Sequence, residues 1–326
     1  MITIESPGGL TLIQDRGRHG FRQLGVGWSG AFDQPAASLA NSLVSNDADA
    51  AVLEVLLGGL RFVAHTTITL AITGAPSGAT VSSEDSIREM PFSQRVEIPS
   101  GAKVELGVPT VGMRTYVAFA GGIDVEQVLG SRSSDTLSNL GPRPLGVGQV
   151  LSLKSDSAKL RTTPPPASRQ SDRLTDLPDI NSLGSGTTDL ASPDLVAALA
   201  ASATSLSQSD SGTPTLAASS SPHAELVNGN LAELLTKRLW TVGDRSSRIG
   251  VRLSGDPLPI DYPSSWESEP TLPGSIQIAP NGELIIFGPD GPTTGGYPVI
   301  AVASAEALVR LSQLRPGSQL RLQISA

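Results

Sequence analysis

The chain contains no cysteine in its 326 residues and few aromatic side chains, which make up 4% of the sequence. The absence of cysteine excludes disulfide bonds, thiolate metal ligands and a cysteine nucleophile. Because apolar residues reach 39% but few are aromatic, the hydrophobic core must rest mainly on Val, Leu, Ile and Ala. A chain of this length is long enough for two domains or one large one.

Positive charge is also scarce. The sequence has 23 basic against 31 acidic residues, a formal net charge of -8, and its basic residues form no cluster. Because nucleic-acid binding needs clustered cations to neutralise phosphates, we expect no nucleic-acid partner. No run approaches the ~18 apolar residues of a membrane span, and the N-terminus does not resemble a signal peptide. These absences predict a soluble, cytoplasmic protein without a membrane partner.

Motifs that bind nucleotides, biotin or metals are missing as well. There is no Gly-x-x-x-x-Gly-Lys-Ser/Thr phosphate loop and no Gly-x-Gly-x-x-Gly motif after a strand. None of the three methionines belongs to a Met-Lys-Met sequence, so the chain has no biotin attachment site. We predict no metal site, because no metal-ligand spacing connects the histidines, which are His19, His65 and His223.

Glycine and proline are abundant, with 34 and 25 residues, which is typical of a turn-rich chain. Short runs rich in Val, Ile, Thr and aromatic residues lie between turn signals, as at 66–72, 95–98 and 115–120. One helix is predicted at 36–44, after an N-cap candidate and a proline, and another at 305–313. Further strands are expected at 50–55, 239–242, 250–253, 275–278, 283–287 and 319–324. We therefore predict a mostly-β fold with a few short helices.

Residues 154–224 differ from the rest of the chain. They are dominated by Ser, Ala, Thr, Pro and Asp, with runs such as Thr-Pro-Pro-Pro at 163–166. Their apolar residues are too few and too small to offset the entropy lost on ordering. We predict a disordered linker or insertion, with at most a short helix around 195–203. It divides the chain into an N-terminal half, residues 1–153, and a C-terminal half, residues 225–326.

The most informative segment is Thr-Thr-Gly-Gly-Tyr-Pro at 293–298, which follows an apolar run and the turn Gly-Pro-Asp-Gly-Pro at 288–292. Adjacent glycines let the backbone approach a ligand, so that N–H groups and hydroxyls can point at one anion or carbonyl. The alternative is a tight turn that uses glycine for its geometry alone.

Two further segments lie in the N-terminal half. In Gln-Asp-Arg-Gly-Arg-His-Gly at 14–20, Asp15 could pair with Arg16 or Arg18, and an arginine beside glycines suits a carboxylate or phosphate. The alternative is a solvated hairpin turn with incidental charges. The segment at 28–33 precedes the predicted helix, whose free N–H groups suit an anion, although Asp33 could simply be its N-cap.

In the C-terminal half, Arg248 and Glu269 stand beside glycine, serine and proline. They are candidates for a substrate clamp and the carboxylate that orients it. The alternative is a surface ion pair, which would contribute little to stability.

These segments belong to an ordered set of motifs: Ser-Pro-Gly at 6–8, Gln-Asp-Arg-Gly-Arg-His-Gly at 14–20, Ser-Gly-Ala-Phe-Asp at 29–33, Ala-Asn-Ser-Leu-Val-Ser-Asn at 40–46, Leu-Glu at 53–54, Ala-Gly-Gly-Ile at 120–123, Gly-Ser-Arg-Ser-Ser-Asp at 130–135, Ser-Arg-Ile-Gly at 247–250, Arg-Leu-Ser-Gly at 252–255, Ser-Glu-Pro at 268–270, Pro-Gly-Ser-Ile-Gln at 273–277 and Thr-Thr-Gly-Gly-Tyr-Pro at 293–298. The set resembles the carboxyltransferase-domain family called allophanate hydrolase subunit 2, whose stand-alone bacterial members are known as the 5-oxoprolinase C-subunit. Phe32 and Ser45 depart from its usual methionine and glycine, and 154–224 is longer than expected.

The resemblance implies two cyclophilin-like β-barrel subdomains. It also implies a heteromeric complex with a homologue of the 5-oxoprolinase B-subunit, related to allophanate hydrolase subunit 1, and with a third component, the A-subunit. The implied reaction is ATP-dependent hydrolysis of 5-oxo-L-proline to L-glutamate, with ATP bound by this chain or shared with a partner. One alternative is a carboxyltransferase subunit that acts on urea or a similar amide with a separate biotin carrier. Another is a regulatory subunit that binds a kinase-inhibitor-like partner.

The resemblance also implies a cleft between the halves. Its expected catalytic residues, of which the first two position water or a proton, are Glu269, Asp290, Thr293 and Thr294. Its expected substrate-binding residues are Gln14, Asp15, Arg18, Arg248, Gln277, Gly295, Gly296 and Tyr297. Among these, Arg248 would hold a substrate carboxylate, and the Thr-Thr-Gly-Gly loop would bind the amide or a phosphorylated intermediate.

Overall fold

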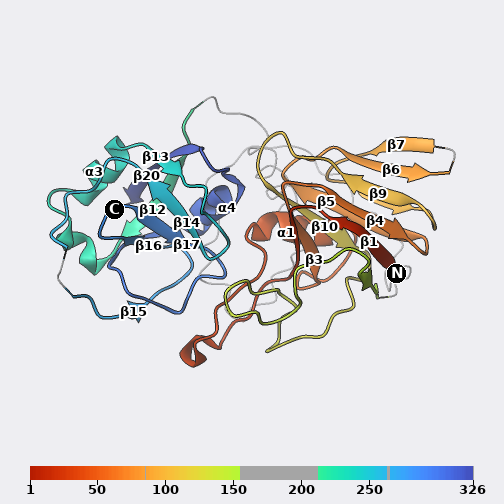
Figure 1. Cartoon of the computed structure of the whole chain (residues 1–326), viewed down its shortest axis with the longest axis horizontal. Helices are drawn as coiled ribbons and strands as arrows, with labels where there is room; N and C mark the ends of the chain where they lie inside the picture. Colours follow the sequence, from red (N-terminus) through yellow and green to blue (C-terminus); the bar gives the residue numbers. More distant parts are fainter. Residues whose placement is uncertain (85, 155–211, 263–264, 326) are drawn as a thin grey trace, which may run out of the picture.

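The computed structural model describes residues 1–84, 86–154, 212–262 and 265–325. Its two halves lie side by side, with helices α1 (Gln34–Leu43) and α4 (Ala305–Gln313) between them (Figure 1). The mostly-β fold expected from the sequence is confirmed. Most of the expected linker, 155–211 with its possible short helix, lies outside the described residues. In the ranges described, no helix is both long and apolar enough to cross a membrane.

The N-terminal half consists of two antiparallel sheets. The first has six strands in the order β11 (Val150–Leu151), β1 (Ile2–Pro7), β4 (Leu60–Ala64), β9 (Lys103–Leu106), β6 (Ala79–Ser83) and β7 (Ser86–Met90). The second has five strands in the order β2 (Leu10–Gln14), β3 (Val52–Leu56), β10 (Arg114–Phe119), β5 (Ile68–Gly74) and β8 (Arg95–Ile98). Side chains from both sheets form one hydrophobic core.

Buried and exposed residues alternate along the strands, and the buried ones form the contact between the two sheets. In β9, Val104 and Leu106 are buried while the two residues between and before them are exposed. Phe62 of β4 and Phe119 of β10 meet edge to face across the core, with ring centroids 5.7 Å apart. The core therefore joins the two sheets into one unit.

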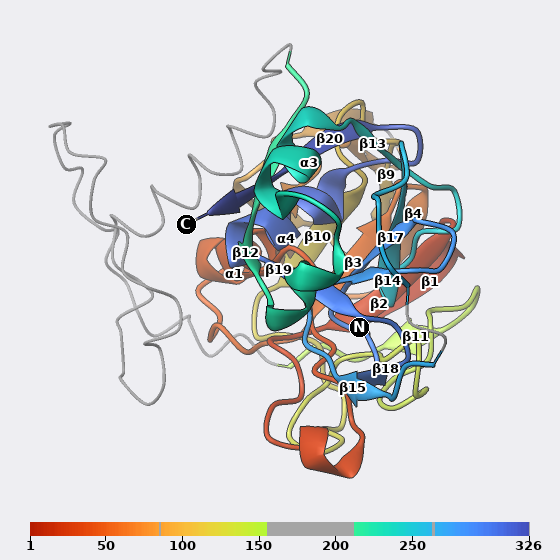
Figure 2. The same ribbon diagram turned by 90° about the vertical axis from the view of Figure 1, so that its left-hand side faces the viewer.

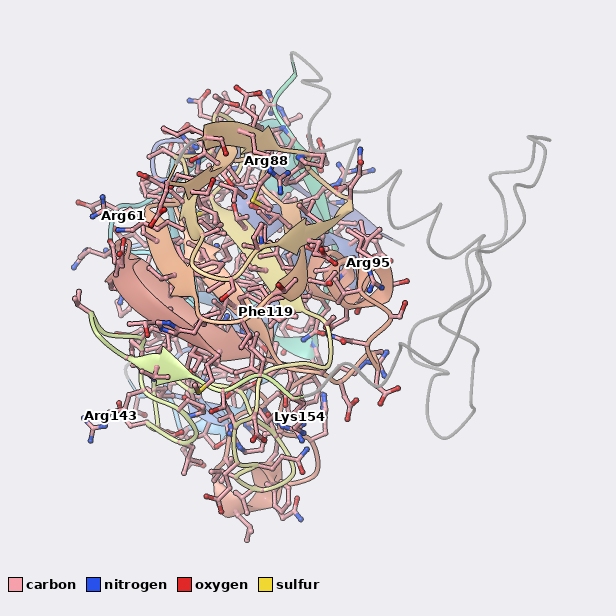
Figure 3. All side chains as sticks on the ribbon, turned by 90° about the vertical axis from the view of Figure 1, so that its right-hand side faces the viewer. Arg61, Arg88, Arg95, Phe119, Arg143 and Lys154 are labelled. Atoms are coloured by element: carbon pink, nitrogen blue, oxygen red, sulfur yellow. The ribbon has the colours of Figure 1, made fainter. Side chains whose placement is uncertain are left out.

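The outer face of the six-stranded sheet carries charges of both signs. Arg61 of β4 lies opposite Glu105 of β9, and Lys103 forms an exposed ion pair with Glu5. Figure 3 shows Arg61 and Arg88 at separate places on this side of the molecule. Exposed pairs contribute little to stability, so this face is a solvated surface.

Helix α1 covers the other face of the five-stranded sheet. It begins as the sequence predicts, with Pro35 in its first turn and the Asp33 carboxylate accepting from the N–H of Ala36 at 3.0 Å. Its buried alanines allow a close approach to the sheet, where Thr73 of β5 donates to the carbonyl of Ala36 at 2.6 Å. Every residue of β10 is consequently buried.

The C-terminal half is built on a closed barrel. Its seven strands follow the order β12 (Thr215–Ser220), β19 (Val299–Ala303), β16 (Ser275–Ile278), β17 (Leu284–Phe287), β14 (Gly250–Ser254), β13 (Trp240–Val242) and β20 (Gln319–Ser325). Fully buried Trp240 lies in its core together with aliphatic side chains of the other strands. The 3-10 helix η4 (Pro222–Leu226) and helix α3 (Leu231–Lys237) follow β12.

One boundary predicted from the sequence is wrong. Strand β12 lies within the expected linker at 154–224, yet it pairs with β19 and β20 and completes the barrel. Its Leu216 and Ala218 are buried, whereas Thr215, Ser219 and Ser220 are exposed. A Ser- and Ala-rich composition therefore conceals an amphipathic strand, and the C-terminal half includes 215–224.

A short two-stranded ribbon lies at one end of the barrel. It consists of β15 (Glu269–Pro270) and β18 (Thr294–Gly295). Figure 2 shows it at the same end of the molecule as the 3-10 helix η1 (Arg22–Leu24), drawn in red-orange. Arg22 donates a hydrogen bond to the carbonyl of Thr271, next to β15. The two halves thus meet at this end as well as along α1 and α4.

Candidate functional site

Arg248 lies at the centre of an ion cluster buried between the two halves. Its side chain is 3% exposed. It donates to both carboxylate oxygens of Asp290, each at 2.9 Å, to Glu54 at 2.7 Å and to the carbonyl of Gly30 at 2.6 Å. Burial alone would lower the pKa of Arg248, but the two carboxylates outweigh it and raise that pKa. The guanidinium is therefore held by groups of the protein itself.

Glu54 of β3 joins this cluster to the N-terminal half. It accepts hydrogen bonds from the N–H of Phe32 at 2.9 Å and from the Tyr116 hydroxyl at 2.8 Å, and Arg114 lies 3.5 Å away. Burial opposes its ionisation, but Arg248 and Arg114 outweigh burial and hold the pKa of Glu54 below its ordinary value. The same burial raises the pKa of Tyr116 well above its ordinary value. Glu54 is therefore an ionised carboxylate between two arginines.

Gln313, at the end of α4, makes a second contact between the halves. Its side-chain oxygen accepts from the N–H groups of Met113 and Arg114, both at 2.9 Å. Its amide nitrogen donates to the Asp33 carboxylate at 2.8 Å. Burial raises the pKa of Asp33 above its ordinary value. The residue that caps α1 is thus tied to the opposite half of the chain.

Asp15 and Arg18 lie in another buried polar cluster, in the loop after β2. The Asp15 carboxylate accepts from the hydroxyl of Ser131 at 2.7 Å. Arg18 donates to the carbonyls of Val128 and Ser133, both at 2.9 Å. Within the described residues, neither Arg18 nor Arg16 forms the expected ion pair with Asp15. Both groups instead hold the loop around 128–133 in place.

Asp290 connects the turn before the loop at 293–298 to the N-terminal half. Its Oδ2 accepts from the N–H and the hydroxyl of Thr136, at 3.0 and 2.7 Å. The N–H of Ser29 also donates to the carbonyl of Pro289 at 2.9 Å. The loop is therefore fixed at its start by contacts with the opposite half.

The loop at 293–298 itself is open to solvent. Thr294 and Gly296 are exposed, and Tyr297 is 38% exposed. Gln277 of β16 donates to the carbonyl of Tyr297 at 2.6 Å. A Cβ at position 295 would clash with the amide of Gln277, whereas a Cβ at 296 would meet nothing within 4 Å. Gly295 thus permits close packing, and Gly296 leaves open space beside the loop.

A histidine and a carboxylate lie directly beside this loop. Glu269 of β15 pairs in register with Gly295 of β18, and its Oε1 accepts from the N–H of Val299 at 2.8 Å. Its Oε2 lies 2.8 Å from Nε2 of His223, and both side chains are partly exposed, at 21% and 35%. The ring of Trp266 packs edge to face on the imidazole, with centroids 4.8 Å apart. Glu269 therefore orients His223 through one ring nitrogen.

The sequence matches the family described as carboxyltransferase domain, subdomain A and B, over residues 24–324. The chain belongs to this family. The carboxyltransferase domain is 31% identical over 320 residues to the 5-oxoprolinase C-subunit from Escherichia coli, a match that covers 98% of this chain and 90% of that protein. It is 30% identical over 336 residues to urea amidolyase from Saccharomyces cerevisiae, covering 98% of this chain but 16% of that protein.

A solved structure shares the fold. The crystal structure of the urea carboxylase from Kluyveromyces lactis superposes with a TM-score of 0.79 at 27% identity. The match covers all of this chain and 27% of that one. The carboxyltransferase domain therefore corresponds to one part of a much longer protein in that case.

The structure separates the predicted site residues of the carboxyltransferase domain into two groups. Seven gather around the open loop, namely Gln277, Glu269, Thr293, Thr294, Gly295, Gly296 and Tyr297. The other five are buried, as Gln277 also is, and contact other protein groups; they are Gln14, Asp15, Arg18, Arg248 and Asp290. Gln14, for example, donates to the carbonyl of Ser134 at 3.0 Å. Of these five, Arg248 and Asp290 hold the turn before the loop, whereas the other three hold the segment around 128–134.

The role expected for Arg248 needs correction. Its donors already face Asp290, Glu54 and a backbone carbonyl, so the guanidinium does not present itself to a substrate carboxylate. Glu269 is not its partner either, since that carboxylate holds His223 and a backbone N–H. In this carboxyltransferase domain, Arg248 holds the two halves together.

Sequence reasoning missed His223, which the low-complexity composition around it assigned to the linker. It also missed the buried roles of Arg114, Tyr116 and Gln313. A lone histidine among serines gives no sign of a carboxylate 46 positions away. The buried character of β10, whose residues alternate poorly between polar and apolar, was the one signal that could have indicated Arg114 and Tyr116.

Proposed function

We propose that this carboxyltransferase domain is one component of an ATP-dependent 5-oxoprolinase, which hydrolyses 5-oxo-L-proline to L-glutamate in the cytoplasm together with partner subunits. The observation that supports this most strongly is the match to the 5-oxoprolinase C-subunit, because it covers 90% of that relative's length. The urea amidolyase match covers 16% of its relative, so most of that protein has no counterpart in the aligned region.

The open loop supplies chemistry that suits amide hydrolysis. With Nε2–H donating to Glu269, the other nitrogen of His223 is free to accept a proton from an attacking water. In the proposed reaction, ATP first phosphorylates the lactam oxygen and ADP leaves. Water then adds to the activated carbonyl carbon, the ring C–N bond breaks as His223 returns the proton to the leaving nitrogen, and a second water releases the phosphate. The hydroxyl of Thr294 and the backbone N–H groups beside Gly296 are suited to stabilise charge on the carbonyl oxygen.

The binding site for ATP is a separate question. The sequence has no phosphate loop to bind the phosphates of ATP. We therefore assign ATP binding to a partner protein. The proposed partners are a homologue of the 5-oxoprolinase B-subunit, from the allophanate hydrolase subunit 1 family, and a third component, the A-subunit.

A second candidate is a carboxyltransferase subunit that acts on urea or a similar amide with a separate biotin carrier. The likeness to the Kluyveromyces lactis urea carboxylase structure favours it. This chain has no biotin attachment sequence, so the carrier would have to be a different protein.

Co-expression of the chain with the candidate partner subunits tests the proposal. We expect the purified complex to release glutamate from 5-oxo-L-proline only when ATP is present. His223→Gln is expected to lower kcat by about 10²–10⁴-fold, the usual contribution of a general base. His65→Gln is the matched control, because His65 is exposed in the N-terminal half, away from the open loop, and contacts Thr3 of the same half. Transfer of carboxyl groups to urea without glutamate release would instead support the second candidate.

A further inference from the structure

A cavity lies on the barrel side of the open loop. Its volume is 340 Å³, and its lining includes Tyr297, Arg245, Arg252, Asn281 and Glu283. This volume is at the lower end of the range of ligand pockets, about 300 to 1,000 Å³, and the cavity is wide open to solvent, so it suits a small molecule bound at the surface. Neither its arginines nor Glu283 belong to the predicted site residues.

The two arginines have no partner of opposite charge among the described residues. Arg245 is exposed and Arg252 is half-buried on β14, between the inward-facing Val251 and Leu253. In the described ranges, neither guanidinium forms a hydrogen bond or an ion pair with another side chain. Arg248, a few positions away, is saturated by Asp290 and Glu54. The cavity thus holds guanidinium groups that are available to a ligand.

The charge of the cavity favours one small anion. Its two arginines and Glu283 give the cavity a net charge of +1, in a chain whose net charge is -8. An arginine binds a carboxylate through two parallel N–H donors, which gives both affinity and orientation. Glu283 opposes a second negative charge, so the cavity should prefer a carboxylate to a phosphate dianion.

Tyr297 connects the cavity to the reactive loop. Its ring lines the cavity, while its backbone carbonyl is held by Gln277 at 2.6 Å. The residues before it, Thr294 to Gly296, form the open part of the loop next to Glu269. The cavity and the open loop therefore share Tyr297, and a ligand in the cavity contacts the end of the loop.

We propose that this cavity is a carboxylate subsite, in which Arg245 and Arg252 bind the carboxylate of a small amide substrate and direct its amide toward the loop. The proposal rests on the proposed function and specifies how the substrate is oriented. It replaces Arg248, which the ion cluster occupies, with Arg245 and Arg252, neither of which is among the predicted site residues.

The test compares 5-oxo-L-proline with 2-pyrrolidinone, the same lactam without the carboxylate. Binding is measured by calorimetric titration of the full chain and of its complex with the partner subunits. We expect 5-oxo-L-proline to bind at least about tenfold more tightly than 2-pyrrolidinone, and Arg252→Gln or Arg245→Gln to remove that difference. Arg61→Gln, on the outer face of the other half, is the matched control and should leave it unchanged (Figure 3).

Equal affinity for the two lactams, or a difference that survives both substitutions, overturns the subsite. So does tighter binding of inorganic phosphate than of 5-oxo-L-proline. Turnover of 5-oxo-L-proline by the complex with an unchanged KM in Arg252→Gln would reject the subsite and keep the proposed function. Arginine-dependent binding without any turnover by the complex would keep the subsite and reject the proposed function.

Discussion

Replacing Arg248 by methionine removes the positive charge that Glu54 and Asp290 share, while the side chain keeps most of its length. Arg248 makes two hydrogen bonds to Asp290 of its own half and, across the boundary between the halves, one to Glu54. Both carboxylates are almost fully buried. The substitution therefore leaves two buried negative charges with weakened compensation.

The expected loss of stability depends on the contacts that Glu54 and Asp290 keep after the substitution. Breaking a buried pair by removing one partner costs about 3–5 kcal/mol. Glu54 keeps Arg114 at 3.5 Å, and Asp290 keeps two hydrogen bonds from Thr136, so we expect the lower part of that range. Against a total of about 5–15 kcal/mol for a typical protein, a loss of about 3 kcal/mol is large. Lys103→Met, which breaks an exposed pair with Glu5, should cost at most about 1 kcal/mol.

Urea unfolding at neutral pH measures this difference. Tryptophan fluorescence reports on Trp28 in the N-terminal half and on Trp240 and Trp266 in the C-terminal half, and far-UV circular dichroism reports on both halves. We expect Arg248→Met to lower the unfolding midpoint and to split the single transition into two, because the shared cluster couples the halves.

A loss below about 1 kcal/mol would refute the reasoning, since it would mean that the carboxylates do not depend on Arg248. Addition of Glu54→Gln and Asp290→Asn to Arg248→Met removes the uncompensated charges. This triple variant should regain part of the lost stability, because neutral replacement of buried ionic groups is often tolerated, but Arg114 loses Glu54 as its partner and limits the recovery. No recovery would indicate that the loss came from packing rather than from charge.

Three smaller predictions concern single residues. The pKa of Glu54 is lowered in the folded chain, so its stabilising contribution is present above pH 4.5 and is lost as the pH falls further. In urea titrations at acid pH, the difference in unfolding free energy between the unsubstituted chain and Glu54→Gln should therefore shrink, and a constant difference would contradict this. The pKa of Asp33 is raised above 3.8, so its carboxyl group holds a proton more strongly in the folded chain than in the unfolded one. The unfolding free energy of the unsubstituted chain should therefore rise relative to that of Asp33→Asn as the pH falls toward 3.8. Gly295→Ala should displace Gln277 and lower stability by about 1 kcal/mol, whereas Gly296→Ala, with open space around it, should be neutral in the same thermal unfolding assay.

Local patterns in the sequence predict much of the fold correctly. The helix expected at 305–313 coincides with α4, and the strand expected at 95–98 coincides with β8. Both carry a clear period of apolar residues and clear end signals, such as Ser304, which caps α4 by accepting from Ala307 at 3.1 Å. β12 has no such signal, because its two buried residues are flanked by serines and threonine, and its pairing with β20 depends on residues about a hundred positions away.

The candidate site was harder to predict for a different physical reason. Arg248 and Glu269 lie in nearby motifs of the sequence, but the packing of the folded chain determines which groups the arginine contacts. Glu54, nearly two hundred positions away, reaches Arg248 only after the halves have packed. His223 lies among serines and alanines, and only the fold brings it to Glu269. Sequence patterns identify polar residues that matter, whereas tertiary packing determines which of them remain open to a ligand.

Some motif residues of this chain hold the two halves together, and others face the open loop. A loss of activity therefore has a different cause in each group. Asp290 lies three positions before Thr293, so the cluster around Arg248 fixes the start of the open loop. Arg248→Met should lower activity by displacing that loop, and the triple variant should restore activity as far as it restores stability. His223→Gln removes a proton acceptor that no change in packing returns, so its activity should stay low in a complex of normal stability. If activity returned with stability in His223→Gln as it does in the Arg248 variants, His223 would serve to stabilise the structure rather than to accept a proton.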